Sequence, residues 1–286
     1  MRSFLADIRR HDVEAAIRVA VSVGVPLLVF DAIGRLDLAV YAAFGGLAML
    51  YGHSEPPKRR VESQILAGTG LVLTIAVAMA YSAAQAPAAV LGALLAVTVI
   101  AAATLGAAMR WVPRGEMFFV LVLLIIANIP TSWDRLPLGI AVGASGAALS
   151  VLLAWLIGAD RADAGGEAAS AGWRRRGAAG YVALDRRQHL VPIVAATLGV
   201  LTAWVLALAL GVGNPFWAAV TVAALMPALV AADVWRRTIH LMLGTLGGVG
   251  VATFLFSFSP GHLALIPVII VCQGAAEIAV AANQGV

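Results

Sequence analysis

Charged residues are scarce in this sequence. Only 12% of its 286 residues are Asp, Glu, Lys or Arg, whereas 62% are hydrophobic. A soluble domain carries about 25% charged residues, and it needs them because most of its surface faces water. With a mean hydropathy of +0.95, the sequence excludes a soluble globular protein and predicts an all-α integral membrane protein surrounded by lipid.

Cysteine and the common catalytic motifs are also lacking. One cysteine, Cys272, excludes an intrachain disulfide and a cysteine-ligated metal cluster. The sequence has no Gly-Lys-Ser/Thr phosphate loop, no nucleophile elbow and no His/Cys/Asp cluster with metal-ligand spacing. We therefore expect no enzyme activity, no metal, no cofactor and no nucleic-acid partner.

Long apolar runs dominate the chain instead. A helix needs about 20 mostly apolar residues to cross a bilayer. The runs predict ten membrane spans, six and then four, of which the fifth is the shortest. An interfacial segment, 1–13, precedes them, and a basic linker, 159–188, separates the two groups. The predicted spans are residues 14–33, 37–52, 65–85, 88–109, 116–130, 137–158, 190–212, 214–231, 239–258 and 262–283.

The basic residues predict the orientation. Lys and Arg near span ends accumulate on the cytoplasmic side. With the N-terminus inside, all of the 19 basic residues except Arg35 and Arg135 fall on the cytoplasmic side. Removing the short fifth span would place the six-arginine linker outside, so the charges favour that span. We expect a multi-pass protein of a bacterial-type inner membrane with a cytoplasmic N-terminus.

The two groups of spans resemble parallel repeats. A gap-free shift by 176 residues keeps each matching residue at the same place in the predicted topology. The matches are Tyr41-Ala42-Ala43 with Trp217-Ala218-Ala219, Arg60 with Arg236, and Gly68-Thr69 with Gly244-Thr245. We expect a first repeat over 14–158 and a second over 189–286. The second would then lack about two helices, and we expect the sequence to be a fragment.

Basic residues at the predicted inner ends suggest a path for anions. Arg236 and His240 are one helical turn apart, as are Arg60 and Gln64. Guanidinium groups bind carboxylates through a two-pronged fork. These two faces, together with Arg237, predict an inner vestibule for organic anions. The alternative is that they anchor the topology by contacting anionic lipid headgroups.

Two further features have a functional and a structural interpretation. Asn214 and Trp217 open a helix near the outer surface, where Trp217 forms either an aromatic belt or a stacking platform for substrate. Glu277 lies among apolar residues of the tenth span. A carboxylate in a span usually has a partner or a function, so Glu277 is either a proton-coupling group or an ion-paired or solvated residue.

Glycines predict close helix packing. Gly244 and Gly248 lie four residues apart on one helical face, and Gly68 precedes a threonine in the corresponding span of the first group. Small residues at this spacing let helix backbones approach each other in lipid. The alternative is that this approach forms part of a substrate path.

The second group also resembles a known family. The residues are Asn214-Pro-Phe-Trp-Ala-Ala-Val-Thr-Val, then Arg236-Arg237, then Leu243-Gly244-Thr245-Leu246-Gly247-Gly248. This pattern is similar to the fusaric acid resistance / aromatic acid exporter family, best over 210–286. The family's arginine before Gly-Thr is replaced here by Leu241 and Met242. The resemblance implies two six-helix halves and export of aromatic or other organic acids driven by protons.

The sequence thus predicts an inner-membrane exporter of small organic anions, aromatic carboxylates in particular, coupled to protons. A passive anion channel and a non-transporting membrane scaffold or assembly protein are the alternatives. The partners we expect are membrane lipids and the anion, and a homo-oligomer is left open.

Overall fold

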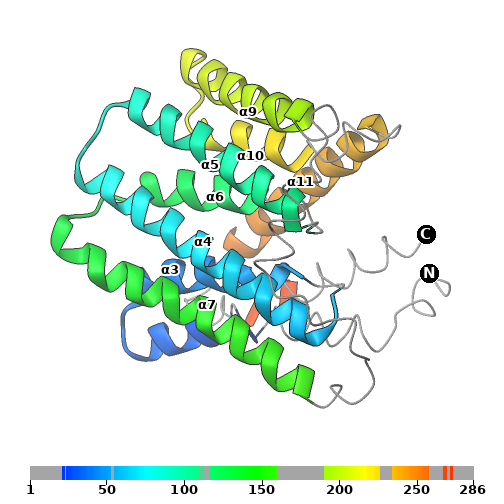
Figure 1. Ribbon diagram of the computed structural model, residues 1–286. Helices are drawn as coiled ribbons and strands as arrows, with labels where there is room; N and C mark the ends of the chain where they lie inside the picture. Colours follow the sequence, from blue (N-terminus) through cyan, green and yellow to red (C-terminus); the bar gives the residue numbers. More distant parts are fainter. Residues whose placement is uncertain are drawn as a thin grey trace. The chain divides into compact units, whose positions relative to one another are not determined.

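The computed structural model describes residues 21–22, 24–52, 55–109, 111, 116–159, 190–225, 234–257, 267–268 and 271–272. In these ranges the chain forms helices and turns without a β-strand. Residues 24–32 are helical. The helices whose bounds lie within the described residues are α3 (Leu36–Gly46), η1 (Leu47–Leu50), α4 (Pro57–Ala83), α5 (Ala88–Met109), α6 (Glu116–Ala127), η2 (Trp133–Arg135), α7 (Leu136–Ala159), α9 (Val191–Ala209), α10 (Phe216–Leu225) and α11 (Val234–Ser257) (Figure 1).

Several helices meet the requirements for crossing a membrane. Within the described residues, four are long and apolar enough: Lys58–Ala83, Ala88–Met109, Trp133–Leu156 and Val191–Ala209. Four shorter apolar helices, Leu36–Leu50, Glu116–Ala127, Phe216–Leu225 and Met242–Phe254, lie at further predicted spans. The predicted all-α membrane protein is therefore confirmed at this level. The full number of ten spans stays a prediction, because residues 14–20 and 23 of the first span and most of the last span, 262–283, lie outside the described residues.

The chain divides into two compact units. Unit 1 comprises Met1–Val72, Gly139–Ala169 and Ser259–Val286, and unit 2 comprises Leu73–Leu138 and Ser170–Phe258. Two borders between the units lie among described residues, and both fall inside helices: one in α4, after Val72, and one at the start of α7, before Gly139. Unit 2 joins α5 and α6 with α9 and α10, so packing combines helices from both predicted repeats. The repeats are a relation between sequences and stay a prediction.

In unit 1, α3 and α7 cross at backbone contact. A Cβ atom at Gly45 would collide with the carbonyl of Gly143, and one at Gly146 would collide with the carbonyl of Ala42. Ser150 closes the crossing, because its Oγ donates to the carbonyl oxygens of Gly46 at 2.8 Å and of Gly146 at 3.2 Å. Packing is the main force that joins helices in lipid, and small residues allow it.

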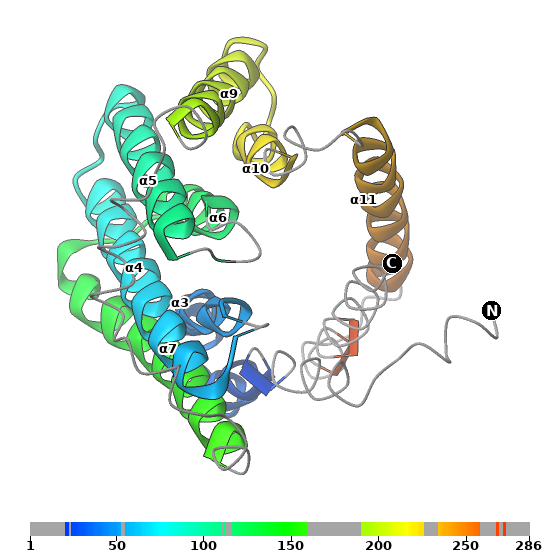
Figure 2. The same ribbon diagram turned by 45° about the vertical axis from the view of Figure 1, so that its right-hand side comes forward.

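In unit 2, four helices form a closed ring, which we call the four-helix ring. α5 packs against α6 and α9, and α10 also packs against α6 and α9 (Figure 2). On α5 the buried residues fall three or four positions apart, as a single helical stripe requires. They are Leu91, Leu95, Val99, Ala102, Gly106 and Met109.

Helix α6 is the short fifth span of the sequence prediction. Its 12 residues extend about 18 Å, less than the hydrocarbon thickness of about 30 Å. Most of its side chains are nevertheless buried, from Glu116 to Ala127. Irregular or short segments are tolerated at membrane depth where protein surrounds them. Because other helices surround α6, a helix shorter than the bilayer thickness can be accommodated at this position.

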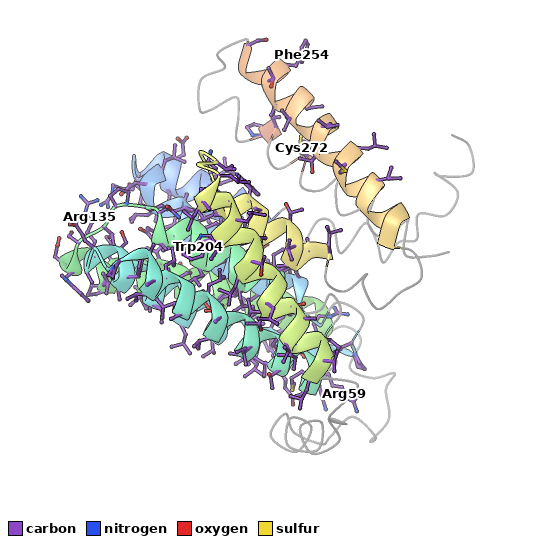
Figure 3. The ribbon with its side chains drawn as sticks, turned by 90° about the horizontal axis from the view of Figure 1, so that it is seen from above. Arg59, Arg135, Trp204, Phe254 and Cys272 are labelled. Carbon is purple, nitrogen blue, oxygen red and sulfur yellow. The ribbon has the colours of Figure 1, made fainter. Side chains whose placement is uncertain are left out.

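An aromatic side chain packs between α9 and α5. Trp204 on α9 is 6% exposed, and Figure 3 labels its position in unit 2. A Cβ atom at Gly92 of α5 would lie 3.1 Å from Cζ3 of Trp204. Gly92 thus leaves the space that the indole ring fills, and the two helices approach closely at this point.

Substitution of Gly146 is expected to destabilise the protein. The methyl group of Gly146→Ala would collide with the backbone of Ala42, and overpacking of this kind costs about 1–3 kcal/mol. The thermal unfolding midpoint in detergent, followed by tryptophan fluorescence, should fall by several degrees. Gly247→Ala on α11 is the matched control, because no described atom lies within 4 Å of its Cβ position. An unchanged midpoint for Gly146→Ala would contradict the backbone contact.

Candidate functional site

The first turns of α4 carry a group of polar side chains inside unit 1. We call Glu55, Arg60, Ser63 and Gln64 the α4 polar cluster. Arg60 is 6% exposed, and Ser63 and Gln64 are fully buried. Two of these residues, Arg60 and Gln64, are sequence-predicted site residues, and the structure brings them together on one helix. The helical spacing of four residues places them about 6 Å apart along the axis.

Gln64 bonds to the end of the preceding helix. Its Nε2 donates to the carbonyl oxygens of Met49 at 3.3 Å and of Tyr51 at 3.4 Å. The last carbonyls of a helix lack partners within the helix, and η1 ends at Leu50. Gln64 Oε1 is buried and has no hydrogen-bond partner among the described residues. This oxygen can accept a hydrogen bond from a water molecule or a ligand.

The connection between η1 and α4 folds back on the helix. Gly52 has φ of 68°, and a Cβ atom there would lie 3.2 Å from Cα of Arg60. Glycine adopts this left-handed conformation without steric cost. Ser63 Oγ donates to Glu55 Oε2 at 2.7 Å, and Arg60 Nη2 donates to the Glu55 carbonyl at 3.1 Å. Glu55 therefore holds the connection against α4 through both its side chain and its backbone.

Glu55 and Ser63 are members of the cluster that sequence reasoning missed. The available signal was local: Glu55 directly precedes Pro56 and Pro57, and proline is favoured at the first helical position. A carboxylate before such a start lies near the first turns of the helix. The bond from Ser63, eight residues further on, depends on the turn at Gly52, which the sequence pattern does not specify.

The residues that match Arg60 and Gln64 in the second predicted repeat lie on α11. Arg236, Arg237 and His240 are all within Val234–Ser257. The helix places Arg236 and His240 one turn apart, as α4 places Arg60 and Gln64. The side chains of the three α11 residues lie outside what the structure describes.

Asn214 and Trp217 lie at the start of α10 in unit 2. The Asn214 carbonyl accepts a hydrogen bond from the Trp217 N–H at 3.3 Å. Trp217 is 55% exposed, and its ring lies 5.4 Å from that of Phe216 at 40°. An exposed tryptophan beside a half-buried phenylalanine fits either an interfacial belt or a stacking surface.

The remaining predicted residues differ in their surroundings. Gly68 is buried in unit 1, where a Cβ atom would lie 3.0 Å from Cβ of Ala147 and 3.4 Å from Cβ of Ala48. For Gly244 and Gly248 on α11, no described atom lies within 4 Å of the Cβ position. Their role in packing stays a prediction. Glu277 lies outside the described residues.

The second predicted repeat matches a known family. Residues 202–286 match the family model described as fusaric acid resistance protein-like. This match confirms the family resemblance over the segment where the sequence pattern placed it. The segment contains Asn214, Trp217, Arg236, Arg237, His240 and Glu277, whereas Arg60 and Gln64 precede it. No curated protein and no solved structure matches the chain.

The family match and the apolar helices agree in the class of protein that they indicate. The matched family is membrane transporter-like, and the helices are those of a multi-pass membrane protein. The matched family is therefore one of membrane proteins associated with transport and efflux.

Ser63 and Glu55 are expected to be energetically coupled. A hydrogen bond to a charged group contributes about 1.5–3 kcal/mol, so the cycle of Ser63→Ala, Glu55→Ala and the double variant should show a coupling energy of about 1 kcal/mol or more. Free energies of unfolding from titration with a denaturing detergent measure it. Thr69→Ala is the control hydroxyl deletion, because Thr69 Oγ1 bonds to its own helix at Ile65. Additive effects of Ser63→Ala and Glu55→Ala would contradict the bond.

Proposed function

We propose that this protein is an inner-membrane exporter of small organic anions, with aromatic carboxylates as the leading class and protons as the driving ion. Two observations support the proposal. Residues 202–286 match a transporter-like family, and a membrane-length helix, α4, begins with a buried guanidinium and a buried amide.

The α4 polar cluster carries the proposal. Burying a charge in an apolar environment is costly unless partners compensate for it, so a buried arginine at a span end is a functional candidate. Arg60 binds a carboxylate in this proposal, because its guanidinium matches a carboxylate in shape and charge. Gln64 Oε1 accepts a hydrogen bond from a donor on the same ligand or from an intervening water molecule.

The architecture that we propose is the sequence-predicted one. It has ten spans, a cytoplasmic N-terminus, and parallel repeats over 14–158 and 189–286 that a basic linker joins. The helix bounds support the repeats: a shift by 176 residues moves α4 onto residues 233–259, and α11 spans Val234–Ser257. In this arrangement Arg236, Arg237 and His240 form a second basic face at the inner end of α11, corresponding to that of Arg60 and Gln64 on α4.

One of the two predicted outer basic residues, Arg35, forms an exposed ion pair. Arg35 forms a two-pronged pair with Asp37, with Nε to Oδ1 at 3.1 Å and Nη2 to Oδ2 at 3.2 Å. The hydrogen bond and the charge of Asp37 raise the pKa of Arg35 above its usual value. This exposed pair leaves the count of basic residues behind the proposed orientation unchanged, because acidic residues contribute little to the positive-inside bias.

Transport is tested with the purified protein in liposomes. Phthalate, terephthalate and succinate are suitable probes, because they are doubly charged at neutral pH and do not cross lipid unaided. An imposed proton gradient should drive at least one of them against its concentration gradient. The absence of movement for all three would contradict the proposal. A proton-independent current that follows voltage would instead favour a passive channel.

Arg60 is expected to contribute to anion affinity. Arg60→Gln should raise KM for the transported anion by about 10-fold or more, because a charge-assisted hydrogen bond contributes about 1.5–3 kcal/mol. Lys58→Gln is the matched control, since it removes the same charge from an exposed position on the same helix turn. Equal effects of the two substitutions would indicate a role for overall charge rather than for Arg60. If the protein is a non-transporting scaffold, cells that carry Arg60→Gln should have the same phenotype as cells that carry the unaltered protein.

A further inference from the structure

The α4 polar cluster already holds a carboxylate, that of Glu55. Glu55 Oε2 accepts a hydrogen bond from Ser63 Oγ at 2.7 Å, and the Glu55 carbonyl oxygen accepts one from Arg60 Nη2 at 3.1 Å. Ser63 is fully buried and Arg60 is 6% exposed, whereas Glu55 is half-buried. A hydroxyl and a guanidinium are donors that any carboxylate ligand can use. Glu55 therefore lies where a carboxylate of another molecule would also find its donors.

Gly52 leaves the space that the Glu55 carboxylate occupies. A Cβ atom at Gly52 would lie 3.2 Å from Glu55 Oε2, 3.1 Å from Cβ of Ser63 and 3.2 Å from Cα of Arg60. These distances are shorter than an unstrained contact between carbon atoms, which is about 3.5–4.0 Å. The carboxylate thus has a defined position, bounded by the Gly52 turn on one side and by the first turns of α4 on the other.

One polar atom of the cluster is left unused by Glu55. Gln64 is fully buried, and its Nε2 donates to the carbonyl oxygens of Met49 and Tyr51, which fixes the orientation of the amide. Gln64 Oε1 has no hydrogen-bond partner among the described residues, and a buried acceptor without a donor is unfavourable. A carboxylate has only acceptors, so Glu55 cannot satisfy this oxygen. A ligand that brings a donor or a bound water molecule can.

We propose that the Glu55 carboxylate is an internal ligand of the α4 polar cluster and that the carboxylate of a transported anion takes its place. This inference rests on the proposed function and adds how the site is held between transport events. The incoming carboxylate accepts the hydrogen bond from Ser63 Oγ and pairs with the Arg60 guanidinium. The Glu55 side chain turns into water, and one carboxylate replaces another, so the net charge at the cluster does not change.

The position of Glu55 suits an internal ligand that can be displaced. A half-buried side chain loses little when it turns into water, whereas the buried Ser63 and Arg60 need acceptors at all times. Glu55 supplies those acceptors while no anion is bound. The transported anion gains the unused acceptor of Gln64 in addition, and this extra interaction favours the exchange.

The first test does not depend on transport. Glu55→Ala removes the internal carboxylate and leaves the donors of Ser63 and Arg60 in place. Formate, a carboxylate small enough for the vacated position, should raise the thermal unfolding midpoint of this variant in detergent by several degrees relative to chloride at equal ionic strength, because a ligand that binds only the folded state stabilises it. The unaltered protein should show no such shift. Glu55→Ser serves for the same measurement if Glu55→Ala does not fold.

Two controls locate the formate. Asp37→Ala removes a carboxylate that pairs with a guanidinium in the same unit but is 52% exposed, and formate should not stabilise it. Adding Ser63→Ala to Glu55→Ala should reduce the formate shift, because the vacated position then lacks its hydroxyl donor. The inference is wrong if formate stabilises Glu55→Ala no more than Asp37→Ala, or if the shift keeps its full size without the Ser63 hydroxyl.

The second test measures displacement during transport. Glu55→Gln keeps the shape of the side chain but loses the charge, which makes it a weaker competitor for charge-assisted donors. KM for whichever of phthalate, terephthalate and succinate is transported should fall by about threefold or more. Glu62→Gln, a partly exposed residue of the same helix, is the control and should leave KM unchanged.

The outcomes separate this inference from the proposed function. A KM for Glu55→Gln that equals or exceeds that of the unaltered protein would overturn the displacement of Glu55 by the anion. Failure of the unaltered protein to transport any probe would contradict the proposed function, whereas a formate shift specific to Glu55→Ala would still show that the cluster binds a carboxylate in place of Glu55.

Discussion

Every buried polar group in this protein needs an internal partner, because lipid offers none. This requirement explains why the described backbone is helical, since a helix satisfies its own N–H and C=O groups. It also explains why several polar side chains in the interior of the described residues make specific bonds. Ser150 bridges two helices, Gln64 meets the carbonyls at the end of η1, and Ser82 donates to the Ile129 carbonyl at 2.7 Å.

The same requirement distinguishes the short helices from the long ones. α3 with η1, α6 and α10 are each shorter than the four membrane-length helices of the described chain. Helix ends leave carbonyl and N–H groups without partners inside the helix, and where such an end is buried, side chains or neighbouring helices must satisfy them. Gln64 does so at the end of η1, and Glu116 lies at such an end on α6.

Helices α4 and α11, which correspond to each other in the two predicted repeats, share two sequence features. Both begin with a basic turn, and both carry glycine where the other does, at Gly68 and Gly244. In unit 1 the glycine is packed against Ala147 and Ala48, so the role of this position is visible there. The family match covers α11 and not α4. The α4 residues of the candidate site are therefore supported by geometry, and the α11 residues by the family match.

The sequence by itself determined the class of protein and much of the helix pattern. Hydropathy gave α5 its bounds of Ala88–Met109 and located α7, but it placed the start of α4 too late, at 65, because it detects apolar length and the helix begins in polar residues at Pro57. The one-turn spacing of Arg60 and Gln64 was also readable, since helical periodicity is local. Contacts between distant segments were not. The tertiary structure alone joined Ser150 to Gly46 across 104 residues, brought Glu55 to Ser63, and buried Glu116 at the start of α6, because burial depends on which helices pack together.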